Sequence, residues 1–109
     1  MDEKTRKAIA DRLVAKFDSG EALTPAELED MTCYLTVVDE WEGEEKRWTR
    51  DMSTIVESPD GRYFRIDWER GLTEVQEPFV YEKQPIEVHR QLEERTVIIT
   101  TWEEGRYGL

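Results

Sequence analysis

Hydrophobic residues recur every three to four positions near the start of the chain and form one stripe. The stripe consists of Ile9, Ala10, Leu13, Val14 and Phe17. This is the spacing of an amphipathic helix, so we predict a helix over residues 4–19 that packs its apolar side on the rest of the protein. Gly20 stands where this helix is expected to end, because glycine readily adopts the left-handed conformation of a helix C-terminus.

A second helix is predicted to begin at Pro25. Thr24 can cap this helix, Pro25 suits its first position, and Glu27 completes a capping box with Thr24. The residues expected on its buried side are Leu28, Met31 and Leu35. The first third of the chain is therefore predicted to be helical.

From about Cys33 the pattern changes to β-branched, aromatic and alternating residues, which is typical of strands. The expected strands span residues 34–41, 50–57, 62–68, 85–92 and 96–102. Pro59 and Asp60-Gly61 occupy turn positions between the second and third of these strands, so we predict a hairpin there. The connections 42–45 and 69–83 are expected to be loops, and residues 105–109 a frayed tail.

These elements predict an α+β domain in which two N-terminal helices pack on a curved antiparallel sheet of four to five strands. We expect a single domain over residues 1–109, with a helical part at 1–32 and a sheet at 33–104. Alternation places Phe64, Ile66 and Trp68 on one face of the hairpin. The expected core comprises Ile9, Leu13, Phe17, Leu28, Met31, Phe64, Ile66 and Trp68.

The composition is strongly acidic, with 26 acidic and 15 basic residues and a formal net charge of -11. Phosphate backbones and anionic membranes repel such a protein, which disfavours direct binding to nucleic acid or membrane and favours a protein partner with a basic surface. Simple solubility is the alternative explanation of the acidity. Residues 1–7 carry no apolar signal region, and no stretch approaches the ~20 apolar residues of a membrane span, so we expect a cytoplasmic protein.

No catalytic constellation is visible in the sequence. His89 is the only histidine and Cys33 the only cysteine, and the two are far apart in the chain. We expect a solvated His89 and a Cys33 in apolar surroundings, not a catalytic pair. Neither a metal-ligand spacing nor a glycine-rich phosphate loop occurs. We therefore predict a protein that is not an enzyme and has no cofactor.

Two acidic groups are the candidate partner-binding residues. They are Asp39, Glu40, Glu42, Glu44 and Glu45 around the first predicted loop, and Glu69, Glu74 and Glu77 in the second. Loops leave such side chains free to meet a basic partner. A paired-carboxylate site built from Asp67, Glu74 and Glu77 is weaker, because 26 acids produce such coincidences throughout so short a chain.

A basic and aromatic cluster follows the first acidic group. Lys46, Arg47 and Arg50 surround Trp48, a combination that could stack a base or bind phosphate. Five acids immediately precede the cluster, so we favour local neutralisation, with a cation-π contact of arginine on the indole.

The order of several motifs carries a family resemblance over residues 33–104. The motifs are Arg47-Trp48, the strand ending Thr54-Ile55-Val56, the segment Gly71-Leu72-Thr73-Glu74-Val75-Gln76-Glu77-Pro78-Phe79, and the closing strand that ends at Trp102. This order resembles a group of small, mostly uncharacterised proteins encoded by bacteriophages and prophages of Gram-positive bacteria. The chain departs from the group at Trp68-Glu69-Arg70, where better-known members carry a Ser-Val type pair. The resemblance implies a phage origin and a bacterial host cell, and it assigns no activity to particular residues.

From charge and resemblance together we expect a phage-type accessory protein that binds a host protein through an acidic surface and inhibits or redirects it. Anti-CRISPR action, anti-restriction and host takeover are the roles considered. One alternative is a strict DNA mimic, which the interleaved basic residues disfavour. The other is a structural or assembly module of a phage, in which Trp41, Trp48 or Tyr63 supports self-association. A monomer or weak homodimer fits these hypotheses.

Overall fold

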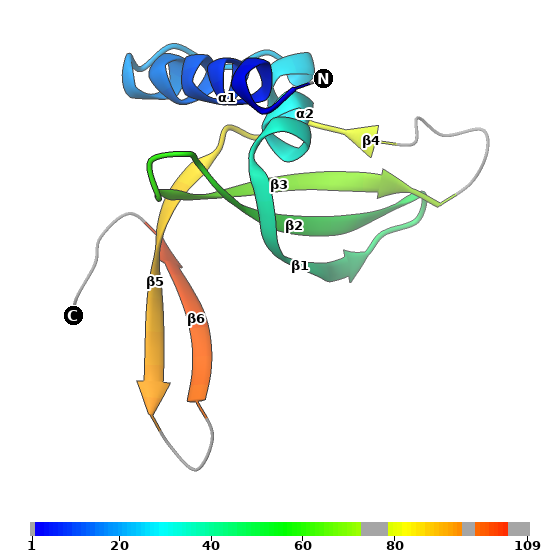
Figure 1. Cartoon of the computed structure of the whole chain (residues 1–109). Helices are drawn as coiled ribbons and strands as arrows, with labels where there is room; N and C mark the ends of the chain where they lie inside the picture. Colours follow the sequence, from blue (N-terminus) through cyan, green and yellow to red (C-terminus); the bar gives the residue numbers. More distant parts are fainter. Residues whose placement is uncertain (1, 73–78, 95–97, 105–109) are drawn as a thin grey trace.

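The computed structural model describes residues 2–72, 79–94 and 98–104, which form a helical layer on one side of an antiparallel sheet (Figure 1). Helix α1 spans Glu3–Asp18, and the carboxylate of Asp2 caps it by accepting a hydrogen bond from the Thr5 N–H at 2.8 Å. Gly20 follows with φ of 82°, the left-handed conformation that the sequence predicted at the end of this helix.

Helix α2 spans Pro25–Tyr34 and has the predicted capping box. The Thr24 side chain accepts from the Glu27 N–H, and the Glu27 carboxylate accepts from the Thr24 N–H at 2.9 Å. Lys16 of α1 donates to the same carboxylate at 2.7 Å. These contacts lower the pKa of Glu27 from 4.5 to about 2, the largest effect being that of the Lys16 ammonium. The start of α2 is thereby tied to the end of α1.

Six strands are described in the sheet. They are β1 (Thr36–Glu45), β2 (Thr49–Glu57), β3 (Tyr63–Gly71), β4 (Phe79–Val80), β5 (Ile86–Glu94) and β6 (Ile98–Glu104). The strand order is β1-β2-β3-β5-β6, and the short β4 pairs with the far end of β3. Every described pairing is antiparallel. The predicted α+β class, with two helices on an antiparallel sheet, is confirmed.

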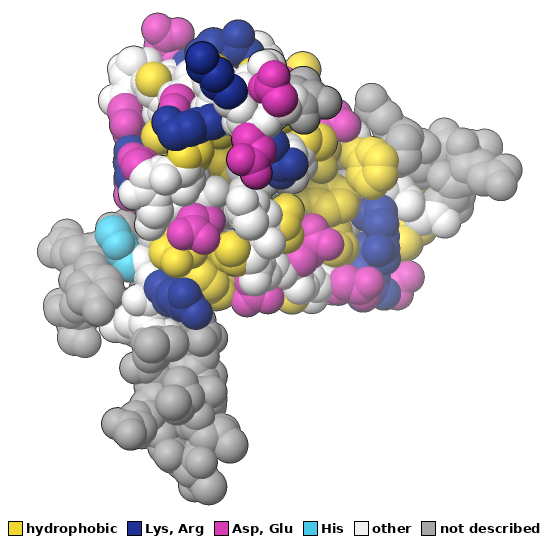
Figure 2. All heavy atoms as spheres, in the orientation of Figure 1, with side chains coloured by type: hydrophobic (Ala, Val, Ile, Leu, Met, Phe, Trp, Pro, Cys, Tyr) yellow, Lys and Arg dark blue, Asp and Glu magenta, His cyan; other side chains and the backbone are white. Residues whose placement is uncertain are grey.

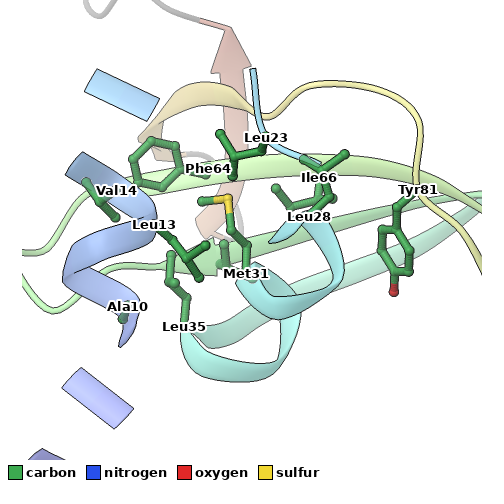
Figure 3. Close-up of a cluster of buried hydrophobic side chains, with 11 residues drawn as sticks. Ala10, Leu13, Val14, Leu23, Leu28, Met31, Leu35, Phe64, Ile66 and Tyr81 are labelled. Carbon is green, nitrogen blue, oxygen red and sulfur yellow. The ribbon is translucent and has the colours of Figure 1, made fainter. Parts of the chain in front are cut away.

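The main core lies between the helices and one face of β2 and β3 (Figure 3). Helix α1 contributes Leu13 and α2 contributes Met31, and both point toward Phe64 and Ile66 of β3. All eight predicted core residues belong to this cluster, with Ile9, Phe17 and Trp68 only partly buried at its margin. The cluster also includes Ala10, Val14, Leu23, Leu35, Val56 and Tyr81. Burial of this apolar surface is the main driving force for packing the helices on the sheet.

Arg62 joins three elements at one end of this core. Its guanidinium donates to Asp18 at the end of α1 at 2.8 and 2.9 Å, and to Glu87 of β5 at 2.9 and 3.1 Å. It also lies 5.2 Å from the centre of the Phe64 ring. The charge of Arg62 holds the pKa of Asp18 below its usual value, and the two carboxylates raise the pKa of Arg62.

The first predicted loop and part of the second are strand. Residues 42–45 continue β1, and residues 69–71 continue β3, where Glu69 faces Asp51 of β2 and Val80 of β4. The prediction was wrong because neither segment alternates in polarity. An exposed edge strand needs no apolar face, since the neighbouring strand supplies its backbone hydrogen bonds. Residues 73–78 of the second predicted loop and the tail at 105–109 lie outside the described residues.

The second face of the sheet carries no helix but is partly covered by the sheet itself. Strands β5 and β6 continue away from the helical layer as a two-stranded arm (Figure 1). Trp102 of β6 donates through its indole Nε1 to Asp39 Oδ2 of β1 at 2.9 Å, and its ring lies 4.9 Å from that of Tyr63. Because β1 and β6 stand at opposite ends of the strand order, this contact requires the sheet to curl. The curl accounts for the full burial of Ile55 and Val88 on this face.

Candidate functional site

Strand β1 is more exposed than strands β2 and β3. All ten of its residues are exposed, and it stands at the end of the strand order, paired with β2 on one side. Its apolar side chains are unusually accessible, with Val37 at 47%, Val38 at 40% and Trp41 at 40% exposure. An edge strand presents unpaired backbone N–H and C=O groups that can pair with another chain. The β1 edge, defined as residues 36–45, is therefore the candidate site.

The first acidic group lies on this strand and not on a loop, which corrects the expected location. The five residues are Asp39, Glu40, Glu42, Glu44 and Glu45. No basic residue occurs between Thr36 and Glu45. Asp39, Glu40 and Glu42 are thus held on a regular stretch of backbone, with Asp39 on one face of the sheet and Glu40 and Glu42 on the other. A register shift lies between Glu42 and Glu45.

Several of these carboxylates already have partners within the protein. Glu42 lies 3.3 Å from Arg50 and 3.2 Å from Arg70, and Glu45 lies 3.1 Å from Arg50. The carboxylates of these pairs are at least half exposed, and exposed ion pairs contribute little to stability. Asp39 accepts the hydrogen bond of Trp102. The local acidity of β1 is therefore partly neutralised at its far end and less so around Asp39 and Glu40.

Glu40 ends a hydrogen-bond chain that begins in the core. The indole Nε1 of Trp68 donates to Thr54 Oγ1 at 2.9 Å, and the Thr54 hydroxyl donates to Glu40 Oε2 at 2.6 Å. Thr54 is fully buried, so this chain fixes the Glu40 carboxylate at the margin of the core. No sequence signal could have identified it, because the two residues bonded to Thr54 are each 14 positions away in the chain.

The same end of the core carries a partly exposed aromatic group. Trp68 stacks on Tyr81 with ring centres 5.4 Å apart and contacts Phe79 at 5.6 Å. Phe79 is 49% exposed, so it lies at the margin of the core and not within it. Burial raises the pKa of Tyr81. Figure 2 shows hydrophobic side chains at the surface near β4, beside acidic and basic side chains.

The second acidic group is only partly described. Glu69 lies on β3, where it accepts a hydrogen bond from the Thr49 hydroxyl at 2.7 Å and faces Lys46 at 3.5 Å. Its carboxylate is therefore engaged within the sheet and does not lie on a loop as expected. Glu74 and Glu77 lie outside the described residues.

The basic and aromatic cluster lies in the connection from β1 to β2. The Arg47 guanidinium is 4.9 Å from the centre of the exposed Trp48 ring, which is the predicted cation-π contact. Lys46 pairs with Asp51 at 3.2 Å, and this carboxylate raises the pKa of Lys46. Arg50 pairs with the preceding acids Glu42 and Glu45. Neutralisation by the preceding acids is therefore confirmed for Arg50. It is wrong for Lys46, whose partners Asp51 and Glu69 follow it in the chain.

A shallow hollow of about 310 Å³ lies on the sheet face opposite the helices. Trp41, Ser53, Arg65 and Asp67 contribute to its lining, and Asp67 bonds both Ser53 at 2.8 Å and Arg65 at 3.2 Å. A larger open groove of about 580 Å³ runs between the start of α1 and the turn from β2 to β3. Both recesses are open to solvent and lined by groups of both charge signs.

The two residues considered for catalysis lie in different parts of the fold. Cys33 is on α2 and exposed, which corrects the expectation of apolar surroundings. His89 is on β5, in register with Glu103 of β6, and is partly exposed. Among residues 2–72, 79–94 and 98–104, no three histidine, cysteine or acidic side chains gather in a way that could hold a metal ion. The helices of the described chain are too short or too polar to cross a membrane.

Comparison of the chain with protein-family models, with curated proteins and with solved structures finds no match.

Proposed function

We propose that this protein is a binding protein without catalytic activity that uses the β1 edge to engage a basic surface of another protein. The observation that carries the proposal is the combination of a free strand edge with five carboxylates and no basic residue on one exposed strand. Acidic groups at an interface attract a basic partner, speed its encounter and repel acidic competitors.

The resemblance to phage proteins gives the proposal a biological setting. In that setting the partner is a host protein whose basic surface ordinarily binds nucleic acid, and binding blocks or redirects it in the bacterial cytoplasm. Restriction enzymes, CRISPR complexes and other nucleic-acid enzymes have such surfaces. A duplex-shaped mimic is not part of the proposal, because Figure 2 shows acidic and basic side chains interleaved over the face in view.

Self-association through the same edge is the second candidate. Exposed Val37, Val38 and Trp41 favour it, because apolar side chains on an open edge promote strand pairing. The carboxylates oppose it, since pairing two β1 strands would align the five acids of each copy. We therefore expect a monomer at neutral pH, and size-exclusion chromatography at micromolar concentration tests this. A dimer that persists at neutral pH would favour the assembly module.

Isosteric neutralisation of β1 tests the proposed function. The variant Asp39→Asn/Glu40→Gln/Glu44→Gln removes three charges and keeps amide oxygens to accept the hydrogen bonds of Trp102 and Thr54. The control Glu3→Gln/Glu21→Gln/Glu82→Gln removes three charges from exposed positions outside β1. Both variants have the same net charge, so they separate a local effect from a general one.

Both variants and the wild-type protein are immobilised, exposed to a bacterial lysate at low and high salt, and the captured proteins are identified by mass spectrometry. We expect a basic partner that wild type and control retain, and that the β1 variant loses. Retention should fall as salt rises, since the Debye length is only about 8 Å at physiological ionic strength. Equal retention by all three proteins would overturn the role of β1.

A further inference from the structure

We propose that the β1 edge binds an extended segment of its partner as an added strand, and that this segment carries lysine or arginine at alternate positions. The inference rests on the proposed function and adds the mode of binding. In this mode the partner does more than attract the acidic surface by charge. Its backbone forms hydrogen bonds with β1, and its side chains contact β1 on both faces of the sheet.

The backbone supplies the first part of the argument. Residues 39–42 pair in regular register with residues 52–55 of β2, and register shifts interrupt the ladder on either side of this stretch. Among the described strands only β2 pairs with β1, so the outer side of residues 39–42 faces no other described strand. One backbone group of this stretch, the Glu40 N–H, donates to Asp39 Oδ1 at 2.9 Å. A strand of this length matches the extended segments that add to sheet edges in other proteins.

The side chains supply the second part. Glu40 and Glu42 face the same side of the sheet as Thr54 and Met52, whereas Asp39 and Trp41 face the side of the curl. Residues two apart in a strand are about 6.7 Å apart, and an added strand has the same spacing. If the partner segment has lysine or arginine at every second position, these side chains lie next to Glu40 and Glu42 on one face of the sheet. The residues between them lie next to Trp41 on the other face.

The two register shifts in the pairing of β1 with β2 limit the length of the bound segment. They also hinder pairing of the β1 edge with another copy of itself. One of them places Gly43 and Glu44 against Asp51, and a Cβ at Gly43 would lie 3.2 Å from the Asp51 Cβ, a tight contact that favours glycine there. Bulges and like charges are devices by which an edge strand avoids pairing with itself. A second copy of the chain would bring further carboxylates to this edge, so a basic segment is the complementary occupant.

A pair of synthetic peptides tests the backbone ladder directly. The probe is a heptapeptide of alternating lysine and valine. Its control has the same sequence with methyl groups on the internal backbone nitrogens, which keeps every charge and prevents strand pairing. Affinity for the full chain is measured by titration calorimetry, and amide hydrogen exchange at residues 39–42 is measured by NMR with each peptide at saturation.

We expect the unmethylated peptide to bind and to slow exchange within residues 39–42 by about tenfold or more. The methylated peptide should bind about tenfold or more weakly, because several backbone hydrogen bonds cannot form. Equal affinity of the two peptides overturns strand addition and leaves charge attraction intact. A dissociation constant weaker than about 1 mM for both peptides also overturns it.

The β1 variant separates this inference from the proposed function. The variant Asp39→Asn/Glu40→Gln/Glu44→Gln should bind the unmethylated peptide more weakly than the wild-type protein does. The control Glu3→Gln/Glu21→Gln/Glu82→Gln should bind it with unchanged affinity. If the β1 variant loses its basic partner but the peptides bind equally, the proposed function holds and the strand model fails. Hydrogen exchange is also measured on the protein without any peptide. If residues 39–42 are already protected there and the protein is a dimer, a second copy occupies the edge and the inference is wrong.

Discussion

The helix-covered side of β2 and β3 and the bare edge of β1 belong to the same sheet but are stabilised by different means. On the covered side, Phe64 and Ile66 have no exposed surface and pack against both helices. On β1 every residue is exposed, and the strand is held by its ladder with β2 and by contacts to Arg50, Thr54 and Trp102. Stability is therefore concentrated in β2, β3 and the helices, and β1 is left free to meet a partner.

The comparison also separates two kinds of charge cluster. The Arg62 cluster connects α1, β3 and β5 beside a buried ring, and its geometry depends on the core. Glu42 and Glu45 of β1 are at least half exposed, and they pair with the less exposed side chains of Arg50 and Arg70. Carboxylates held this loosely can exchange an internal arginine for a basic group of a partner at little cost.

The largest expected effect is on the covered side. Phe64→Ala should lower the free energy of unfolding by about 3 to 5 kcal/mol, because the ring is fully buried and a cavity would replace it. Val38→Thr on β1 should change it by less than about 0.5 kcal/mol, since Val38 is exposed. Urea denaturation of both variants measures the difference. Comparable losses would mean that β1 contributes to the core as strongly as β3 does.

A smaller effect is expected at the two arginines. Arg62→Met should cost about 1 to 2 kcal/mol, since Asp18 and Glu87 both lose their partner at the end of the core. Arg50→Met should cost less than about 1 kcal/mol, because Glu42 and Glu45 are at least half exposed. Methionine keeps an apolar stem in both variants, so the comparison isolates the charge. A larger loss for Arg50→Met in urea would contradict it.

The smallest effect concerns the pH dependence of the link between α1 and α2. The folded-state pKa of Glu27 is about 2, below its ordinary 4.5, so its ionised form stabilises the fold. The stabilisation is fully present above pH 4.5 and is lost as the pH falls toward about 2. The difference in melting temperature between wild type and Glu27→Gln should shrink over this range. A difference that stays constant would show that Lys16 and Thr24 do not hold the carboxylate.

Local patterns were sufficient for the helices and the hairpins. The stripe of Leu13 and Phe17, the cap at Thr24 and the turn at Gly61 each act over a few residues, so the sequence displays them directly. The alternation of Phe64 and Ile66 likewise identified the buried face of β3. The α+β class and most of the core follow from these signals.

The acidic composition of the site could be predicted from the sequence, but its secondary structure could not. The run from Asp39 to Glu45 predicted an acidic surface, and residues 42–45 of it were predicted to be a loop. The structure makes it a strand, because β2 offers backbone partners and the exposed edge requires no apolar face. A hydrophobic pattern in the sequence indicates which side chains are buried. A strand held mainly by backbone hydrogen bonds has no such pattern and is not predicted by it.

The sequence by itself determined where the helices begin and end, which face of the hairpin is buried, and that the surface is acidic. These properties depend on dihedral preferences, on apolar periodicity and on charge, which neighbouring residues fix. Only the tertiary structure decided that β1 is an open edge, that Glu40 is bonded through Thr54 to Trp68, and that Trp102 reaches Asp39. Trp102 and Asp39 are 63 positions apart, and only the order and curl of the strands bring them together.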